Sequence, residues 1–153
     1  MGEGWRARMD INNTLNEVLV KLFRDINTIE ERAIRTGEYQ DVTANDMHVI
    51  EAIGTNTVKN MTSVARELEV TTGTLTISVN GLVKKGYVNR SRSEEDRRVV
   101  LISLSDKGVR AYLHHQEFHE KMIAAVLAGL SEEEQRVLGQ ALFKLNQFFR
   151  EAY

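Results

Sequence analysis

Two histidines four residues apart are candidate metal ligands in this 153-residue sequence. His115 and His119 would project from the same face of a helix, and paired imidazoles at that spacing suit zinc. His48 is a third candidate that would have to join them across space. The chain has no cysteine, which removes thiolate ligands. Half-buried, hydrogen-bonded helix histidines are the other interpretation, and the sequence leaves both open.

A second group of candidate binding residues is positively charged and lies between residues 84 and 98. This segment holds six cations and three acids, so its net charge is +3 in a chain of net charge −2. The cations are Lys84, Lys85, Arg90, Arg92, Arg97 and Arg98. A local patch suffices to bind nucleic-acid phosphates even when the whole chain is slightly acidic. The alternatives are an ordinary charged hairpin and a hairpin that binds an acidic protein.

Small and short polar side chains precede the basic segment at helical spacing. This face holds Gly73, Thr74, Ile77, Asn80, Gly81 and Lys84, whereas the opposite face holds Leu75, Ser78, Val79 and Leu82. Small side chains let a helix lie deep in the major groove, which is about 12 Å wide, and threonine and asparagine can hydrogen-bond base edges. A solvated helix face would have the same composition.

The sequence has none of the spacings typical of an enzyme. It contains no Gly-rich phosphate loop, no nucleophile elbow and no paired carboxylates in an apolar context. We therefore expect no catalytic residues and no cofactor.

Helical periodicity and helix-end signals predict the elements that position these residues. Apolar residues recur every three or four positions from about Ile11 to Arg35, and Gly37 is a natural stop. Thr43 is the expected cap of a second helix that Gly54 ends. The later predicted elements are a helix over Ser63–Leu68 capped by Thr62, a helix from Thr71 or Thr72 to about Lys85, strands over Tyr87–Arg92 and Val99–Ser105, a helix from Ser105 to Gly129, and a last helix opened by a capping box at Ser131.

The order of elements predicts a mainly α fold with a small β-hairpin wing, that is, a winged helix-turn-helix. We expect a flexible extension over residues 1–10, a dimerisation and effector helix over 11–36, a DNA-binding region over 40–105 and dimerisation helices over 106–153, all in one compact domain. The terminal helices carry more apolar surface than one lobe can cover, which favours a homodimer over a monomeric six-helix domain. No apolar run approaches the roughly 20 residues that span a bilayer, so we expect no membrane contact and a cytoplasmic protein.

Three segments resemble the recognition helix and wing of the MarR family of transcriptional regulators. They are residues 71–76 (TTGTLT), 82–88 (LVKKGYV) and 96–108 (DRRVVLISLSDKG). The resemblance implies a triangular six-helix dimer whose two winged lobes bind an inverted repeat in double-stranded DNA. It also implies that Arg98, with Arg97 beside it, enters the minor groove. Many members carry a long basic residue where Ile77 stands, and this departure favours an A·T-rich site.

The residue types and the resemblance together define the candidate DNA-binding set. It comprises Thr62, Thr71, Thr72, Thr74, Thr76, Ile77, Asn80, Lys84, Arg90, Arg92, Arg97 and Arg98.

Further segments resemble the FabT subgroup, the repressors of fatty-acid biosynthesis genes. They are residues 45–50 (NDMHVI), 70–75 (VTTGTL), 90–100 (RSRSEEDRRVV), 118–122 (FHEKM) and 129–134 (GLSEEE). This resemblance implies a long-chain acyl-acyl carrier protein as corepressor. The candidate acyl-chain residues are Leu19, Leu22, Phe23, Ile26, Met47, Ile50, Phe118 and Met122, each of which is also an ordinary core residue. A regulator that responds to zinc or to a small molecule is the alternative.

Overall fold

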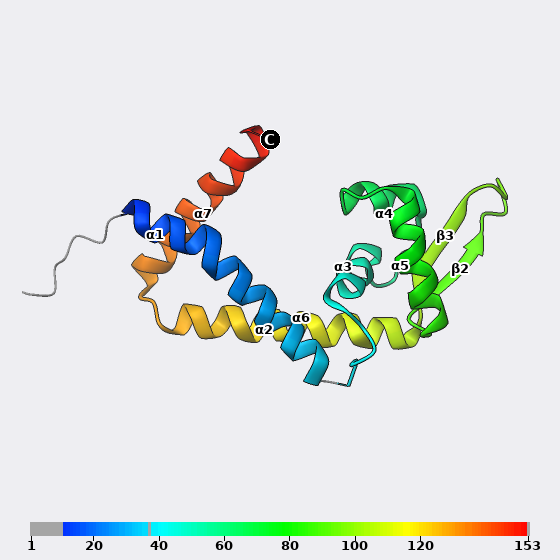
Figure 1. Cartoon of the computed structure of the whole chain (residues 1–153), viewed down its shortest axis with the longest axis horizontal. Coiled ribbons are helices and arrows are strands. Elements are labelled where there is room, and N and C mark those ends of the chain that lie inside the picture. The colour runs from blue at the N-terminus through cyan, green and yellow to red at the C-terminus, as the bar shows by residue number, and fades with distance from the viewer. Residues whose placement is uncertain (1–10, 37, 153) are drawn as a thin grey trace, which may run out of the picture. The chain divides into compact units, whose positions relative to one another are not determined.

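The computed structural model describes residues 11–36 and 38–152 and is mostly helical, with one small sheet (Figure 1). Residues 1–10, predicted as an extension, and Gly37, predicted as a helix stop, lie outside the described residues. The chain forms two compact units that meet within one helix, between Tyr112 and Leu113. In chain order the elements are α1 (Ile11–Glu17), η1 (Val18–Leu22), α2 (Phe23–Thr36), α3 (Ala44–Ile53), β1 (Lys59–Asn60), α4 (Met61–Glu67), α5 (Thr72–Lys84), β2 (Val88–Arg92), β3 (Val100–Leu104), α6 (Asp106–Ala128) and α7 (Glu132–Ala152).

The predicted first helix is confirmed, with a π-helical segment inside it. Helix α1, the π-helix η1 and helix α2 follow one another without a break, since Glu17 and Phe23 both have helical backbone angles. The hydrophobic repeat did not indicate this segment, because one wider turn moves the apolar stripe only slightly around the helix. None of the helices among residues 11–36 and 38–152 is long and apolar enough to cross a membrane.

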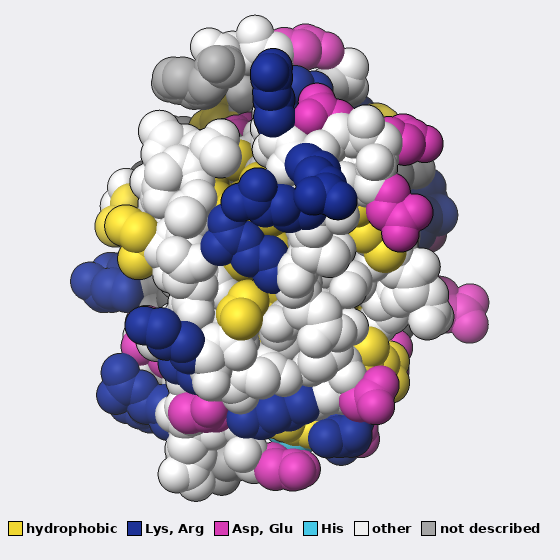
Figure 2. Space-filling view, turned by 90° about the vertical axis from the view of Figure 1, so that its right-hand side faces the viewer, with side chains coloured by type: hydrophobic (Ala, Val, Ile, Leu, Met, Phe, Trp, Pro, Cys, Tyr) yellow, Lys and Arg dark blue, Asp and Glu magenta, His cyan; other side chains and the backbone are white. Residues whose placement is uncertain are grey.

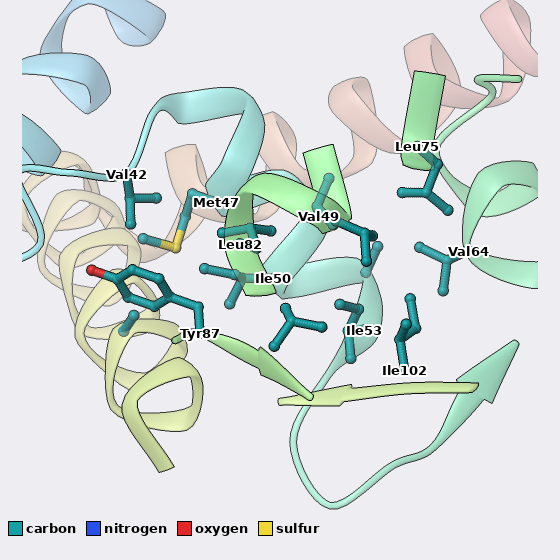
Figure 3. Close-up of a cluster of buried hydrophobic side chains, with 14 of the residues drawn as sticks. Val42, Met47, Val49, Ile50, Ile53, Val64, Leu75, Leu82, Tyr87 and Ile102 are labelled. Carbon is teal, nitrogen blue, oxygen red and sulfur yellow. The ribbon is translucent and has the colours of Figure 1, made fainter. Parts of the chain in front are cut away.

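The core of the first unit lies between helices α3, α4 and α5 and the sheet (Figure 3). Helix α3 begins with the predicted cap, a capping box in which Thr43 and Asp46 bond each other's backbone N–H groups. Helix α5 buries Leu75, Val79 and Leu82, as the sequence predicted for its inner face. The opposite face of α5 therefore points away from the core.

The sheet has three strands rather than the two of the predicted hairpin. Strands β2 and β3 pair antiparallel, and β1 adds to the other edge of β3. Helix α4 begins directly after β1, where the Asn60 side chain accepts a hydrogen bond from the Ser63 backbone N–H at 2.8 Å. The prediction that Thr62 caps this helix is therefore wrong: Asn60 is the cap, and Thr62 lies inside the first turn.

The second unit consists of the end of α6 and helix α7. The predicted capping box is confirmed, because the Glu134 carboxylate accepts from the Ser131 backbone N–H at 2.8 Å while the Ser131 hydroxyl accepts from the Glu134 N–H. Helix α7 has no buried residue. Its large apolar side chains are exposed, with Leu142 at 51% and Phe143 at 71%.

A close backbone contact joins the start of α6 to the turn before β2. The Ser105 hydroxyl donates to the Gly86 carbonyl oxygen at 2.6 Å, and the Ser105 N–H donates to the Tyr87 carbonyl oxygen. A Cβ atom on Gly108 would clash with that Tyr87 oxygen, whereas Gly139 has open space around it. We expect Gly108→Ala to lower the free energy of unfolding by about 2 kcal/mol or more, because backbone cannot move aside as a side chain does.

Denaturant unfolding of both glycine variants checks this expectation. Gly139→Ala, in the open part of α7, should stabilise the protein by up to about 1 kcal/mol through helix propensity alone. Gly108→Ala as stable as the wild type would show that the contact is looser than described.

Asp41, Tyr87 and Lys107 form a polar cluster beside the same turn. The buried Tyr87 hydroxyl donates to Asp41 Oδ1 at 2.5 Å, and Lys107 Nζ lies 4.1 Å from the Tyr87 ring centroid and 3.6 Å from Asp41 Oδ2. The hydrogen bond from Tyr87, and then the Lys107 charge, hold the pKa of Asp41 below its ordinary value. Burial raises the pKa of Tyr87, and its bond to Asp41 raises it further.

These pKa shifts predict how the stability of the protein depends on pH. A carboxyl whose pKa is lowered by folding stabilises the native state above its unfolded pKa, which is about 4, and loses that effect as pH falls through the native value. We therefore expect Asp41→Asn to be less stable than wild type at pH 7 and the difference to shrink toward pH 3. Urea unfolding at pH 7, 5 and 3 measures it, and a constant difference would contradict the assignment.

Candidate nucleic-acid interface

The outward face of α5 carries short polar side chains and one apolar side chain. Thr71 is the N-cap, and its hydroxyl accepts from the Thr74 backbone N–H at 3.1 Å. Of the two caps that the sequence allowed, the structure selects Thr71 over Thr72. Ile77 is 76% exposed and is not part of the hydrophobic core, so packing does not explain an apolar residue at this position. Because most side chains on this face are short, the helix could come close to the base edges at the floor of a DNA groove.

A basic hollow of about 450 Å³ lies between α4, α5 and the wing, which is the hairpin formed by β2 and β3. Figure 2 views the molecule from the right-hand side of Figure 1 and shows Lys and Arg side chains gathered near the middle of that face, next to a hydrophobic side chain. The hollow is lined by Asn60, Met61, Thr62, Ser63, Arg66, Thr72, Thr76, Arg90, Arg98, Val99 and Val100. Three guanidinium groups with threonine and serine hydroxyls between them can hold a phosphate, because arginine donates paired hydrogen bonds to phosphate oxygens.

The wing tip is held by bonds to its own backbone. The Asp96 carboxylate accepts from the Arg98 backbone N–H at 2.9 Å, and the Ser93 N–H donates to the Val99 carbonyl oxygen. Arg92 reaches the carbonyl oxygen of Arg97 at 3.4 Å. Asp96 therefore fixes the backbone that carries Arg98, so that the exposed guanidinium extends from a defined loop.

The structure brings together five of the predicted DNA-binding residues around the basic hollow. They are Thr62, Thr72, Thr76, Arg90 and Arg98. Thr74, Ile77, Asn80 and Lys84 lie on the exposed or half-buried surface of α5, and Arg92 and Arg97 lie near the wing tip.

Sequence reasoning missed Arg66, which supplies the third guanidinium of the hollow. Its signal was weak: Arg66 follows Thr62 by four residues in a helix, so both lie on one face. Helix α4 carries one arginine and one glutamate, so its charge pattern gives no signal of a phosphate site.

The candidate acyl-chain residues are distributed over both units. In the first unit Leu19, Leu22 and Phe23 are exposed and Ile26 is half-buried. Met47 and Ile50 are fully buried in the winged-helix core beside Leu82 and Tyr87 (Figure 3). Phe118 and Met122 are half-buried residues of α6 in the second unit.

Two close contacts involve the candidate metal ligands. In α6 the Nε2 atoms of His115 and His119 lie 3.0 Å apart, so the predicted shared helix face is confirmed. In the first unit His48 Nε2 lies 3.8 Å from a Glu30 carboxylate oxygen. An imidazole pair at this spacing is compatible both with a hydrogen bond between neutral rings and with two ligands of one metal ion.

Comparisons with known proteins agree with this geometry. Residues 36–113 match the protein family described as Transcriptional regulator SarA/Rot. The fold is similar to that of Streptococcus pneumoniae FabT in complex with DNA, with a TM-score of 0.87 and 39% identity over 93% of this chain and 99% of that one.

Two curated proteins have similar sequences along most of their length. The HTH-type transcriptional regulator YwhA of Bacillus subtilis is 26% identical over 88% of this chain and 94% of its own. The transcriptional regulator ZitR of Lactococcus lactis is 27% identical over 71% of this chain and 77% of its own. These relatives are regulators and not enzymes. With its recognition helix, its wing and these similarities, the chain belongs to the MarR family of winged-helix, DNA-binding transcriptional regulators.

Proposed function

We propose that this protein is a homodimeric repressor that binds an inverted repeat in duplex DNA and controls fatty-acid biosynthesis genes. In this proposal long-chain acyl-acyl carrier protein is the corepressor, so accumulated acyl chains strengthen operator binding. The observation that carries the DNA-binding part is the basic hollow between α4, α5 and the wing.

Contacts with the DNA divide between phosphate and base. Arg66, Arg90 and Arg98 line the hollow, and a phosphate seated there would fix the protein on the duplex without reading sequence. The exposed face of α5 would then lie along the base edges, where the Ile77 side chain can contact thymine methyl groups. An A·T-rich operator follows from that contact, with Arg97 and Arg98 directed at the minor groove.

A second copy of the chain is the proposed partner for the exposed apolar helices. Large apolar side chains remain exposed along α7 and along the first helices, and contiguous surfaces of this kind mark interfaces. Those on one side of α7 are Val137, Leu138, Leu142, Phe148 and Phe149, whereas Phe143 lies on the other side. A dimer would present two copies of α5 with twofold symmetry, which an inverted repeat matches.

The proposed target genes and corepressor rest on similarity to FabT. The Streptococcus pneumoniae protein is 39% identical to this chain over nearly its whole length. Acyl carrier proteins are acidic, and α2 carries the exposed cations Arg24, Arg32 and Arg35 as candidate docking residues. The acyl chain itself would need apolar side chains, which Leu19, Leu22, Phe23 and Ile26 offer.

Band-shift titrations test this function with three probes. They are the duplex upstream of the protein's own gene, fatty-acid synthesis promoters and a scrambled duplex of equal length. We expect specific binding to an inverted repeat, with an apparent Kd that falls when acyl-loaded carrier protein is added and not when unloaded carrier protein is added. Specific binding that ignores the loaded carrier would end the fatty-acid assignment, and failure to prefer any duplex would end the repressor assignment.

A metal-responsive regulator on the same scaffold is the second candidate. It is favoured by the 3.0 Å separation of His115 and His119 Nε2 atoms, close to the separation of two ligands of one zinc ion. Titration of the dimer with zinc, followed by a chelator, tests it. Operator affinity that changes with neither addition would eliminate this candidate.

A further inference from the structure

We propose that Arg90 sets the base preference of the recognition helix by holding the Asn80 amide in one orientation, so that Asn80 reads guanine rather than adenine. This inference rests on the proposed function, in which α5 lies in the major groove. It assigns the wing a role in base recognition besides its contacts with the DNA backbone.

The orientation of the Asn80 amide follows from its partner. Arg90 Nη1 donates to Asn80 Oδ1 at 2.8 Å. A guanidinium group has donors and no acceptor, so the end of the amide that faces Arg90 must be the oxygen. The Asn80 oxygen is therefore turned toward strand β2, and the Nδ2 group, with its two N–H donors, points away from Arg90.

Both side chains extend from well-fixed backbone. Val79 and Leu82, on either side of Asn80, are fully buried and hold α5 against the core. Arg90 stands opposite the buried Ile102 in the β2–β3 register. The two possible orientations of an exposed amide are otherwise similar in energy, and a charge-assisted hydrogen bond from a fixed arginine selects one of them.

The selected orientation changes what Asn80 can recognise in the major groove. Asparagine binds adenine with both ends of its amide, since the oxygen accepts from N6 and the nitrogen donates to N7. With the oxygen turned to Arg90, only donors remain for the base. Guanine presents two neighbouring acceptors, N7 and O6, whereas adenine presents N7 beside an N6 donor and thymine presents O4 alone. Asn80 should therefore favour guanine and disfavour adenine.

This preference refines the operator expected from Ile77. The exposed Ile77 side chain favours thymine methyl groups, so the site should be A·T-rich around it. Each half-site should contain one G·C pair, at the position that Asn80 contacts. The two half-sites should carry this pair at symmetric positions.

Selection from randomised duplexes, followed by competition titrations of single-base variants, tests the proposal. The full-length dimer is compared with Asn80→Ala, Arg90→Met and Arg90→Lys. The matched control is Arg92→Met, which removes a cation from the same strand without touching the bond to Asn80. All titrations are made at one salt concentration, because a lost phosphate contact weakens binding to every sequence alike.

We expect wild type to prefer guanine over adenine at one position per half-site by roughly 5- to 100-fold. Asn80→Ala should abolish the preference at that position only. Arg90→Met should move the preference toward adenine, whereas Arg90→Lys, which retains a donor, should keep part of it. Arg92→Met should weaken binding but leave the guanine preference at the Asn80 position unchanged.

Two results would overturn the proposal while leaving the DNA-binding function intact. One is a position that Asn80→Ala flattens but at which wild type prefers adenine. The other is an Arg90→Met profile identical to that of wild type at every position. A wild-type protein without any sequence preference would instead remove the proposed function on which this inference rests.

Discussion

Leu142→Glu should leave a monomer that binds the inverted repeat at least about 100-fold more weakly than the dimer does. Leu142 is 51% exposed on α7, within the apolar surface assigned to the second copy. A carboxylate buried at such an interface without a partner loses its hydration, and that cost exceeds what one contact contributes. A dimer that contacts both half-sites binds with at least about 100-fold higher affinity than a monomer that contacts one. Operator affinity should therefore fall by that factor or more. Sedimentation and band-shift titration measure the two effects.

The matched control for this variant is Gln140→Glu. Gln140 is an exposed residue of the same helix, and the change adds the same charge on the side of α7 opposite Leu142. It should remain dimeric and bind the operator as wild type does. Leu142→Glu that stays dimeric would show that α7 is not the interface and would require another face for dimerisation.

Arg66→Ala and Arg98→Ala should each weaken operator binding and reduce its dependence on salt. Both guanidinium groups line the hollow that we assign to a phosphate. Loss of one phosphate contact lowers the slope of log affinity against log salt by about one, and loss of a good groove contact weakens binding by about 1–3 kcal/mol. Arg66→Ala should weaken all sequences alike, whereas Arg98→Ala should weaken sites with A·T-rich flanks most, because we also direct Arg98 at the minor groove.

Arg136→Ala is the control for the loss of one positive charge. Arg136 lies on α7, paired with Glu133, and is absent from the hollow. Its salt slope should match that of wild type. Salt slopes of Arg66→Ala and Arg98→Ala that also match the wild type would mean that the hollow does not hold a phosphate.

The sequence by itself determined most of the helices, the caps of α3 and α7 and the inward face of α5. Thr43 and Ser131 cap their helices through side chains only three residues away, so local spacing is sufficient to predict them. The buried positions Leu75, Val79 and Leu82 follow from helical periodicity alone. The basic segment was also visible, because charge is a property of composition.

Only the tertiary structure decided which side chains meet across elements. Asn60 caps α4 because β1 pairs with β3, some 40 residues later in the chain, and a two-residue strand has no periodicity to detect. Arg66 joins Arg98 in one hollow only because α4 packs beside the wing.

The bond between Arg90 and Asn80 likewise depends on how α5 lies against β2. Local hydrogen bonds and hydrophobic repeats are encoded within a few residues. The contacts that place one functional group against another are set by packing between distant segments, and their geometry has no signature in sequence spacing.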